Sequence, residues 1–473
     1  MDQKKTLAKN TILIGLAKTS AALVSFLLLP VMTAHIGTED YGLLDLVISY
    51  SGLIIPLVVL SLDLGIFRFL IDARGDEDRV RVIISTVIRT VLPIILLGSL
   101  IFIIVASLLQ LKLAWFILLY LLSALVLGVV QAMARGLGKN GVFAIGSMVS
   151  SILTIVGAVV ALLVFQGGLE GIFVAYIGAQ LVGTLITIIP TKTYRYISMK
   201  KFDAATRKEL LGYSLPLVPN SISWWVFNVS DRTIIAAVLG TSANGIYAVS
   251  NRFSGILSSI QGVLYTSWME ASSMNINSKS RDSFFSSVFN NEIRIFVGLA
   301  TLLLAGLAIG FNWLVAPDYN EAYIYVPVLV IGNIFNLVVG FYSAIYAAKK
   351  MTKKVLSTSI VAAAINLVVN LGLVWFIGVW AAAISTAVAY MILAIYRHFD
   401  MKKTVKVALD KGLVAQCVGL FGLICVLYYI NIPWLNIVSL AVAIAGVVAL
   451  NWHLIMNTKK AGVKMLLQKT RKK

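Results

Sequence analysis

The chain has 473 residues, of which 59% are hydrophobic and only 12% are charged, and its mean hydropathy is +0.93. The charged fraction is about half of the ~25% typical of soluble domains, which excludes a soluble globular protein. The net charge of +19 would suit nucleic-acid binding, but the placement of the cations excludes that partner. A span needs roughly 20 apolar residues. We therefore predict an all-α polytopic membrane protein with about 14 transmembrane helices.

Six spans are expected in residues 1–190, which we predict to form an N-terminal lobe. The first apolar run, Thr11–Ala34, exceeds the about 7–15 residues of a signal-peptide core and is predicted to be a span. The second span is centred near residue 54. Prolines inside apolar runs predict kinked helices; they are Pro56, Pro93, Pro216, Pro219 and Pro327.

A polar, basic connector at residues 191–210 contains aromatic residues among its lysines and arginines. This pattern predicts a short amphipathic helix on the inner membrane surface. Residues 211–397 are expected to form a C-terminal lobe with spans seven to twelve, and residues 398–473 two further spans and a basic cytoplasmic tail. Lobes of six spans insert in the same orientation. A pseudo-two-fold axis along the membrane normal is therefore expected to relate them, as in parallel-repeat transporters.

A short repeat supports two similar halves. At a constant spacing of 203 residues, Gly37, Thr38, Gly42, Ser51 and Gly52 recur as Gly240, Thr241, Gly245, Ser254 and Gly255. Both copies begin in a turn between long apolar segments, so we predict two similar hairpins on the outer side of the membrane.

The lysines and arginines collect on one side of the predicted membrane. The exceptions among the 39 are Lys112 in an outer loop, and Lys18, Arg232 and Arg252 within spans. Outer loops carry acids instead, namely Glu39, Asp40, Glu170, Asp318 and Glu321. The positive-inside rule then predicts that both termini are cytoplasmic. The basic loops are expected to touch anionic membrane lipids.

Arg232 and Arg252 flank the second copy of the turn. At about 1.5 Å per residue, each lies roughly 11–12 Å below it on consecutive helices. A charge at the centre of a span costs about 2.5–3.5 kcal/mol on insertion scales, which favours a functional role. We predict that these arginines, with Lys18, bind the anionic headgroup of a substrate, since arginine grips phosphate through two parallel hydrogen bonds. The alternative is a structural pair of Asp231 with Arg252.

Polar and aromatic neighbours complete the predicted site. Asp231 is a candidate for ion coupling, because a buried carboxylate beside arginines can exchange a proton or sodium ion; simple charge balance is the alternative. Sugar contacts are predicted for Asn228, Asn251, Trp224 and Trp225. Interhelical hydrogen bonds and an interfacial aromatic belt explain the same residues without a substrate.

No cofactor, metal or catalytic centre is expected. Cys417 and Cys425 share one predicted helix, and the histidines at positions 35, 398 and 453 are scattered. The outer loops are too short for a catalytic domain, so an enzyme is not predicted. Gly136-Leu-Gly138-Lys-Asn-Gly141 follows no strand and is interpreted as a tight turn rather than a dinucleotide site.

Three groups of residues carry a resemblance to a known family. They are Ile36-Gly-Thr-Glu-Asp-Tyr-Gly42; Ser230-Asp231-Arg232 with Leu239-Gly and Gly245-Ile-Tyr247; and Asn366 and Asn370 with Gly378-Val-Trp-Ala381. The chain resembles the polysaccharide transporter family of lipid-linked oligosaccharide flippases. That family lies within the superfamily that also contains the multidrug and toxin extruders.

The resemblance implies two six-helix lobes that work by alternating access. The implied substrate is an oligosaccharide repeat unit on undecaprenyl pyrophosphate, moved from the inner to the outer leaflet of the bacterial plasma membrane with ion coupling, expected to be to protons. Glycosyltransferases and a polymerase of glycan assembly are the implied partners. A small-molecule extruder of the same superfamily is the first alternative, disfavoured because such proteins typically have twelve spans. A membrane glycan polymerase or acyltransferase is the second.

Overall fold

The computed structural model describes residues 26–198 and 200–470, without the side chains of residues 220, 224, 227, 228, 453–455 and 457–470. Every regular element in that part of the chain is an α-helix or a short 3-10 helix. The predicted all-α fold is therefore confirmed. By compactness the chain divides into two units, Met1–Ala248 and Val249–Lys473.

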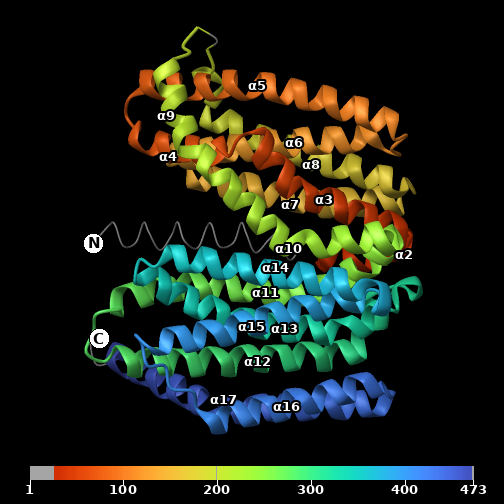
Figure 1. Cartoon of the computed structure of the whole chain (residues 1–473), viewed down its shortest axis with the longest axis vertical. Coiled ribbons are helices and arrows are strands. Elements are labelled where there is room, and N and C mark those ends of the chain that lie inside the picture. The colour runs from red at the N-terminus through yellow and green to blue at the C-terminus, as the bar shows by residue number, and fades with distance from the viewer. Residues whose placement is uncertain (1–25, 199, 471–473) are drawn as a thin grey trace. The chain divides into compact units, whose positions relative to one another are not determined.

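The first unit is drawn in red to green in Figure 1. Its helices are α2 (Leu29–His35), α3 (Thr38–Val58), α4 (Leu62–Asp72), α5 (Glu77–Leu108), α6 (Ala114–Gly136), α7 (Asn140–Leu163), α8 (Gly168–Thr191), η1 (Thr193–Tyr196), α9 (Ala204–Ser214), η2 (Leu215–Leu217), α10 (Val218–Leu239) and the start of α11 (Thr241–Asn275). Helix α8 packs against α6 and α7, and α10 packs against α3.

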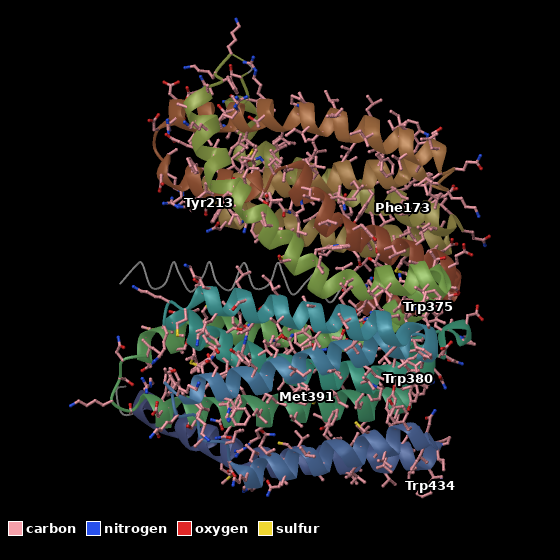
Figure 2. All side chains as sticks on the ribbon, viewed as in Figure 1. Phe173, Tyr213, Trp375, Trp380, Met391 and Trp434 are labelled. Carbon is pink, nitrogen blue, oxygen red and sulfur yellow. The ribbon has the colours of Figure 1, made fainter. Side chains whose placement is uncertain are left out.

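The second unit is drawn in green to blue. Its helices are the remainder of α11, α12 (Arg281–Leu314), η3 (Pro317–Tyr319), α13 (Ala322–Ala348), α14 (Thr352–Ile377), α15 (Trp380–Lys402), α16 (Lys411–Ile430) and α17 (Pro433–Thr470). Helix α15 packs against α13 and α14, while α12 contacts α16 and α17. Trp380, labelled in Figure 2, packs edge-on against Tyr325 at 5.1 Å between ring centroids.

Eleven described helices are long and apolar enough to cross a membrane, namely α3, α5–α8 and α12–α17. Of the other predicted spans, the first lies mostly outside the described residues. The seventh and eighth correspond to α10 and α11, which have 22 and 35 residues but carry more polar side chains. The chain is thus a polytopic helical membrane protein.

The sequence indicated a single helix for the second predicted span, but the structure divides it into two. Helix α3 contains Pro56 and ends at Val58, and α4 begins at Leu62. Between them Leu60 and Ser61 are both left-handed, with φ of 53° and 52°. Proline removes an intrahelical hydrogen bond, and left-handed non-glycine residues cannot continue a right-handed helix. The apolar run therefore breaks in its second half.

The basic connector folds back onto the first unit. Asp203 caps α9 by accepting hydrogen bonds from the amide and hydroxyl of Thr206, at 2.7 and 2.6 Å. These bonds hold the pKa of the Asp203 carboxyl below its ordinary value. Helix α9 packs against α4 and α5. The predicted division into lobes at residues 190, 210 and 397 stays a prediction.

A reciprocal tyrosine pair ties α16 to α13. The Tyr323 hydroxyl donates to the Tyr428 carbonyl at 2.8 Å, and the Tyr428 hydroxyl donates to the Tyr323 carbonyl at 3.0 Å. The two rings stack with centroids 3.9 Å apart. These contacts attach one of the two additional C-terminal helices to the second unit.

Arg397, a cation predicted to lie on the cytoplasmic side, is buried. It lies within α15 and is 1% exposed. Its guanidinium donates to neutral oxygens of α13 and α14: Ser343 Oγ (2.5 Å), Thr358 Oγ1 (2.8 Å), Ser359 Oγ (3.0 Å) and the carbonyls of Val355 (3.2 Å) and Val339 (3.3 Å). Arg397 therefore joins three helices of the second unit.

We expect Arg397→Met to lower the thermal stability of the purified protein markedly. Methionine keeps much of the side-chain length but leaves the oxygens of α13 and α14 without their donor. A buried polar group left without a partner costs about 1–3 kcal/mol. Thermal unfolding in detergent measures the effect. Lys402→Met, which removes a charge from an exposed position on the same helix, is the control, and equal losses in both variants would contradict the structural role of Arg397.

Candidate substrate-binding site

The site begins with an ion pair between two helices of the first unit. Arg232 on α10 approaches Asp45 on α3, with Nε 2.8 Å from Oδ2. The Asp45 side chain is 5% exposed and that of Arg232 is 21% exposed. A partly buried charge pair is screened less than an exposed one. Arg232 is therefore held in place by a carboxylate from a distant part of the sequence.

Asp45 is a residue of the candidate site that sequence reasoning missed, although a signal was present. Asp45 lies eight residues after Gly37, and Arg232 lies eight residues before Gly240. The two charges therefore lie at matching depth below the two repeated turns. Asp231, the acid considered from sequence, is adjacent to Arg232, and neighbouring residues of a helix point about 100° apart.

Asp231 faces a different partner within the first unit. It is buried and accepts a hydrogen bond from the Tyr247 hydroxyl at 3.2 Å. Tyr247 belongs to the start of α11, just after the turn that follows α10. The carboxylate thus links α10 to α11, while its predicted role in ion coupling stays a prediction.

Hydrogen bonds and ring packing of aromatic residues also join α3 to α10. Trp225 Nε1 donates to the Ser49 carbonyl at 2.8 Å, and the hydroxyls of Tyr50 and Thr233 lie 3.1 Å apart. The rings of Tyr50 and Trp225 pack with centroids 5.1 Å apart. Trp225, predicted to contact sugar, is thus largely engaged by α3; its contact with sugar stays a prediction.

The two copies of the repeat contact each other reciprocally. A Cβ on Gly42 would lie 1.9 Å from the Thr241 carbonyl oxygen, and a Cβ on Gly245 would lie 2.0 Å from the Thr38 carbonyl oxygen. The hydroxyls of Thr38 and Ser242 lie 2.5 Å apart. Only glycine allows this approach of the backbones. We call this contact of residues 38–42 with residues 241–245 the glycine interlock.

The glycines of the two turns are not equivalent. Gly240 has φ of +94°, a conformation that L side chains rarely adopt. Its counterpart Gly37 has φ of −72° and meets no atom within 4 Å of a built Cβ. The first position of the repeat is therefore replaceable in one copy and constrained in the other.

The other predicted site residues are placed separately. Arg252 and Asn251 are half-buried on the part of α11 that belongs to the second unit. Lys18 lies outside the described residues, and so do the side chains of Trp224 and Asn228. Substrate contacts by these five residues stay predictions.

We expect a double-mutant cycle to detect the ion pair of the site. Removing one partner of a buried pair lowers the free energy of unfolding by about 3–5 kcal/mol. Because Arg232 is partly exposed, we expect Asp45→Ala to lower it by an amount at or below that range. The variant that removes both charges should be more stable than the sum of the single losses implies, by at least about 1 kcal/mol. Thermal unfolding of the four proteins in detergent measures the coupling. Additive losses would contradict the pair.

Comparison with solved structures defines the class of fold. A multidrug resistance MATE family transporter of the MOP superfamily, inward-facing, matches with a TM-score of 0.67 at 14% identity, covering 82% of this chain and 95% of its own. The lipid II flippase MurJ, inward closed, matches with a TM-score of 0.69 at 13% identity, covering 95% and 99%. A MATE transporter from Vibrio cholerae, VcmN, matches at 0.55 and 17%, covering 84% and 96%. The chain has the membrane fold shared by these proteins.

The family follows from the sequence. The model of the family described as polysaccharide biosynthesis protein matches residues 7–273, which include α3, α10, the glycine interlock and the Arg232–Asp45 pair. The chain belongs to this family. No curated protein matches it.

Proposed function

We propose that the protein is a flippase for an oligosaccharide repeat unit linked to undecaprenyl pyrophosphate. It would carry this substrate from the inner to the outer leaflet of the bacterial plasma membrane by alternating access. The proposal treats the protein as a transporter and not as an enzyme. Its family membership and its fold, which a lipid II flippase shares, both support it.

The observation that carries the proposal is the Arg232–Asp45 pair. Arg232 has five N–H donors, and the ion pair engages the Nε side of its guanidinium. A pyrophosphate that competes with Asp45 for this guanidinium would meet a donor fork suited to phosphate oxygens. Arg252 and Lys18 are the further cations proposed for the same headgroup.

Asp231 is the proposed coupling residue. Its carboxylate is buried, and its hydrogen bond to Tyr247 spans the turn between α10 and α11. Uptake or release of a proton at Asp231 would change that hydrogen bond, and with it the contact between the two helices. Proton-driven exchange is therefore the proposed energy source, with charge balance as the alternative role.

Analysis of membrane lipids after deletion of the gene tests the proposal. We expect complete, unpolymerised repeat units on undecaprenyl pyrophosphate to accumulate facing the cytoplasm. The deletion strain complemented with the wild-type gene is the control. Normal glycan and normal lipid pools, in a host without a second flippase, would overturn the proposal.

A small-molecule extruder is the second candidate, favoured by the likeness to MATE transporters. The two candidates differ in the deletion strain. Deletion of an extruder would leave glycan lipids unchanged and raise the intracellular level of a cationic dye. The partners proposed for the flippase are membrane lipids, glycosyltransferases and a glycan polymerase on the side of the basic loops, with both termini cytoplasmic.

A further inference from the structure

Two helices of the first unit are interrupted. The first interruption lies between α3 and α4, where Leu60 and Ser61 adopt left-handed conformations after Pro56. The second lies between α9 and α10, where η2 (Leu215–Leu217) contains Pro216. Helices α9 and α10 follow each other along one bent path in Figure 1. Kinks of this kind have identifiable causes, proline above all.

The second interruption contacts α4 just beyond the first. Ser214, the last residue of α9, places its Oγ 2.2 Å from where a Cβ on Gly65 would lie, one turn into α4. Tyr213, labelled in Figure 2, packs edge-on against Phe69 of α4 with ring centroids 6.0 Å apart. The second interruption therefore lies against α4, about one helical turn past the first.

Above the interruptions, α3 and α10 are tied to each other. The ties are the Arg232–Asp45 ion pair, the hydroxyl contact of Tyr50 with Thr233, and the hydrogen bond from Trp225 to the Ser49 carbonyl. These contacts lie within residues 45–50 of α3 and cross directly from one helix to the other. Helices α3 and α10 are therefore expected to move together.

Below the interruptions, α4 and α9 belong to a different body. Leu62, Ile66 and Leu70 of α4 and Leu210 of α9 are buried in one apolar cluster with residues of α5 and α6. Val59 of the first interruption belongs to the same cluster, and the last turn of α3 packs against it through Ile55 and Val58. The segment that leads into α9 is fastened to α5, because Ser85 Oγ donates to the Tyr196 carbonyl at 3.0 Å and accepts from the Ser198 amide at 2.9 Å. Helices α4 and α9 are therefore fixed to the α5–α6 core.

The junction itself contains two buried hydroxyls without a partner. Ser61 is 1% exposed and Ser214 is 0% exposed, and neither Oγ has a hydrogen-bond partner among the described residues. Buried polar groups are nearly always satisfied. Two unsatisfied hydroxyls beside two helix breaks indicate a place where partners change between conformations.

We propose that residues 59–61 and 214–217 form a paired hinge, about which α3 and α10 swing as one body against α4, α9 and the α5–α6 core. The swing carries the Arg232–Asp45 pair with it. As the moving step of transport, the hinge rests on the proposed function. As a motion, it does not depend on what the protein carries.

Spin-label distances test the hinge in the full-length protein in nanodiscs, with Cys417 and Cys425 replaced by serine. The pair Asp40→Cys/Asp72→Cys spans the hinge, because it joins the start of α3 to the end of α4. The pair Asp40→Cys/Leu239→Cys lies within the α3–α10 body, and Asp72→Cys/Lys208→Cys lies within the α4–α9 body. We expect two distance populations across the hinge and a single population within each body.

Pro216→Ala restores a backbone N–H at the second interruption. We expect one of the two distance populations across the hinge to become dominant in this variant. Pro93→Ala, the same change inside α5, is the control and should leave both populations as they are. A single unchanged distance across the hinge, or two populations within either body, would overturn the proposal.

A designed disulfide tests the fixed half of the hinge independently. The Cβ of a residue 65 side chain would lie 3.6 Å from the Ser214 Cβ, which is within the about 3.5–4.5 Å that a disulfide needs. Oxidised Gly65→Cys/Ser214→Cys should keep both distance populations across the hinge, and their loss would show that α4 and α9 separate during the motion. Normal glycan and lipid pools after deletion of the gene would, by contrast, overturn the proposed function and leave the result of the distance measurement unaffected.

Discussion

Gly42→Ala should abolish transport, and Gly245→Ala should do the same. Each added methyl group would lie about 2 Å from a carbonyl oxygen of the other copy of the repeat. Backbone cannot move aside as a flexible side chain can, so α3 and the start of α11 must separate. We expect glycan export supported by a complementing plasmid to fall at least about 100-fold. The separation also pulls α3 away from Arg232, and a 1 Å misplacement of a functional group can by itself cost that much activity.

Gly37→Ala is the matched control for this prediction. It belongs to the same repeat, has an ordinary φ and meets no atom within 4 Å. Glycan export and protein level in the membrane are measured for the three variants side by side. Full activity of Gly42→Ala at normal protein level, or equal loss in Gly37→Ala, would show that the glycine interlock does not matter for transport.

Arg232→Ala and Arg252→Ala should each abolish complementation of a deletion strain. Protein levels should stay near normal for Arg252→Ala and fall for Arg232→Ala, which breaks the ion pair with Asp45. The guanidinium is the proposed contact with pyrophosphate, and a charged hydrogen bond to phosphate is about twice as strong as a neutral one. Arg232→Lys should retain a fraction of the activity, because lysine keeps the charge but loses the planar fork.

The ion pair of Arg232 supplies a control for this experiment. Arg232→Ala leaves Asp45 as a buried charge without its cation, which by itself destabilises the protein. Arg232→Ala/Asp45→Asn removes both charges and should regain stability without regaining transport. If this double variant, or both single arginine variants, exports glycan normally, the anion-site hypothesis is wrong.

The membrane fold was predictable because it depends on long-range averages of the sequence. Apolar runs of span length indicate helices, and eleven of them are described as such. The break after Val58 was not predicted, because the residues that adopt left-handed conformations there, Leu60 and Ser61, are of types that do not favour it. Pro56 was the visible signal, and a kink was all that it indicated.

The site was predictable only in part, because its partners come from distant helices. Arg232 and Asp231 were identified from the cost of burying charge. The partner of Arg232 depends on which helix packs against α10, and only the matching depth of Asp45 pointed to it. The burial of Arg397 was not predicted, because its hydrogen-bond acceptors lie on α13 and α14, which are distant in the sequence.

We propose that this chain moves a pyrophosphate-linked glycan across a bilayer with Arg232 as its anion contact. Purified protein reconstituted into vesicles with a fluorescent undecaprenyl-pyrophosphate oligosaccharide tests it, with a membrane-impermeant quencher reporting the leaflet. We expect quenching to rise with time in wild-type vesicles under a proton gradient, and to stay at the level of empty vesicles for Arg232→Ala/Asp45→Asn. Wild-type vesicles that behave like empty ones, or a double variant that matches the wild type, would contradict the claim.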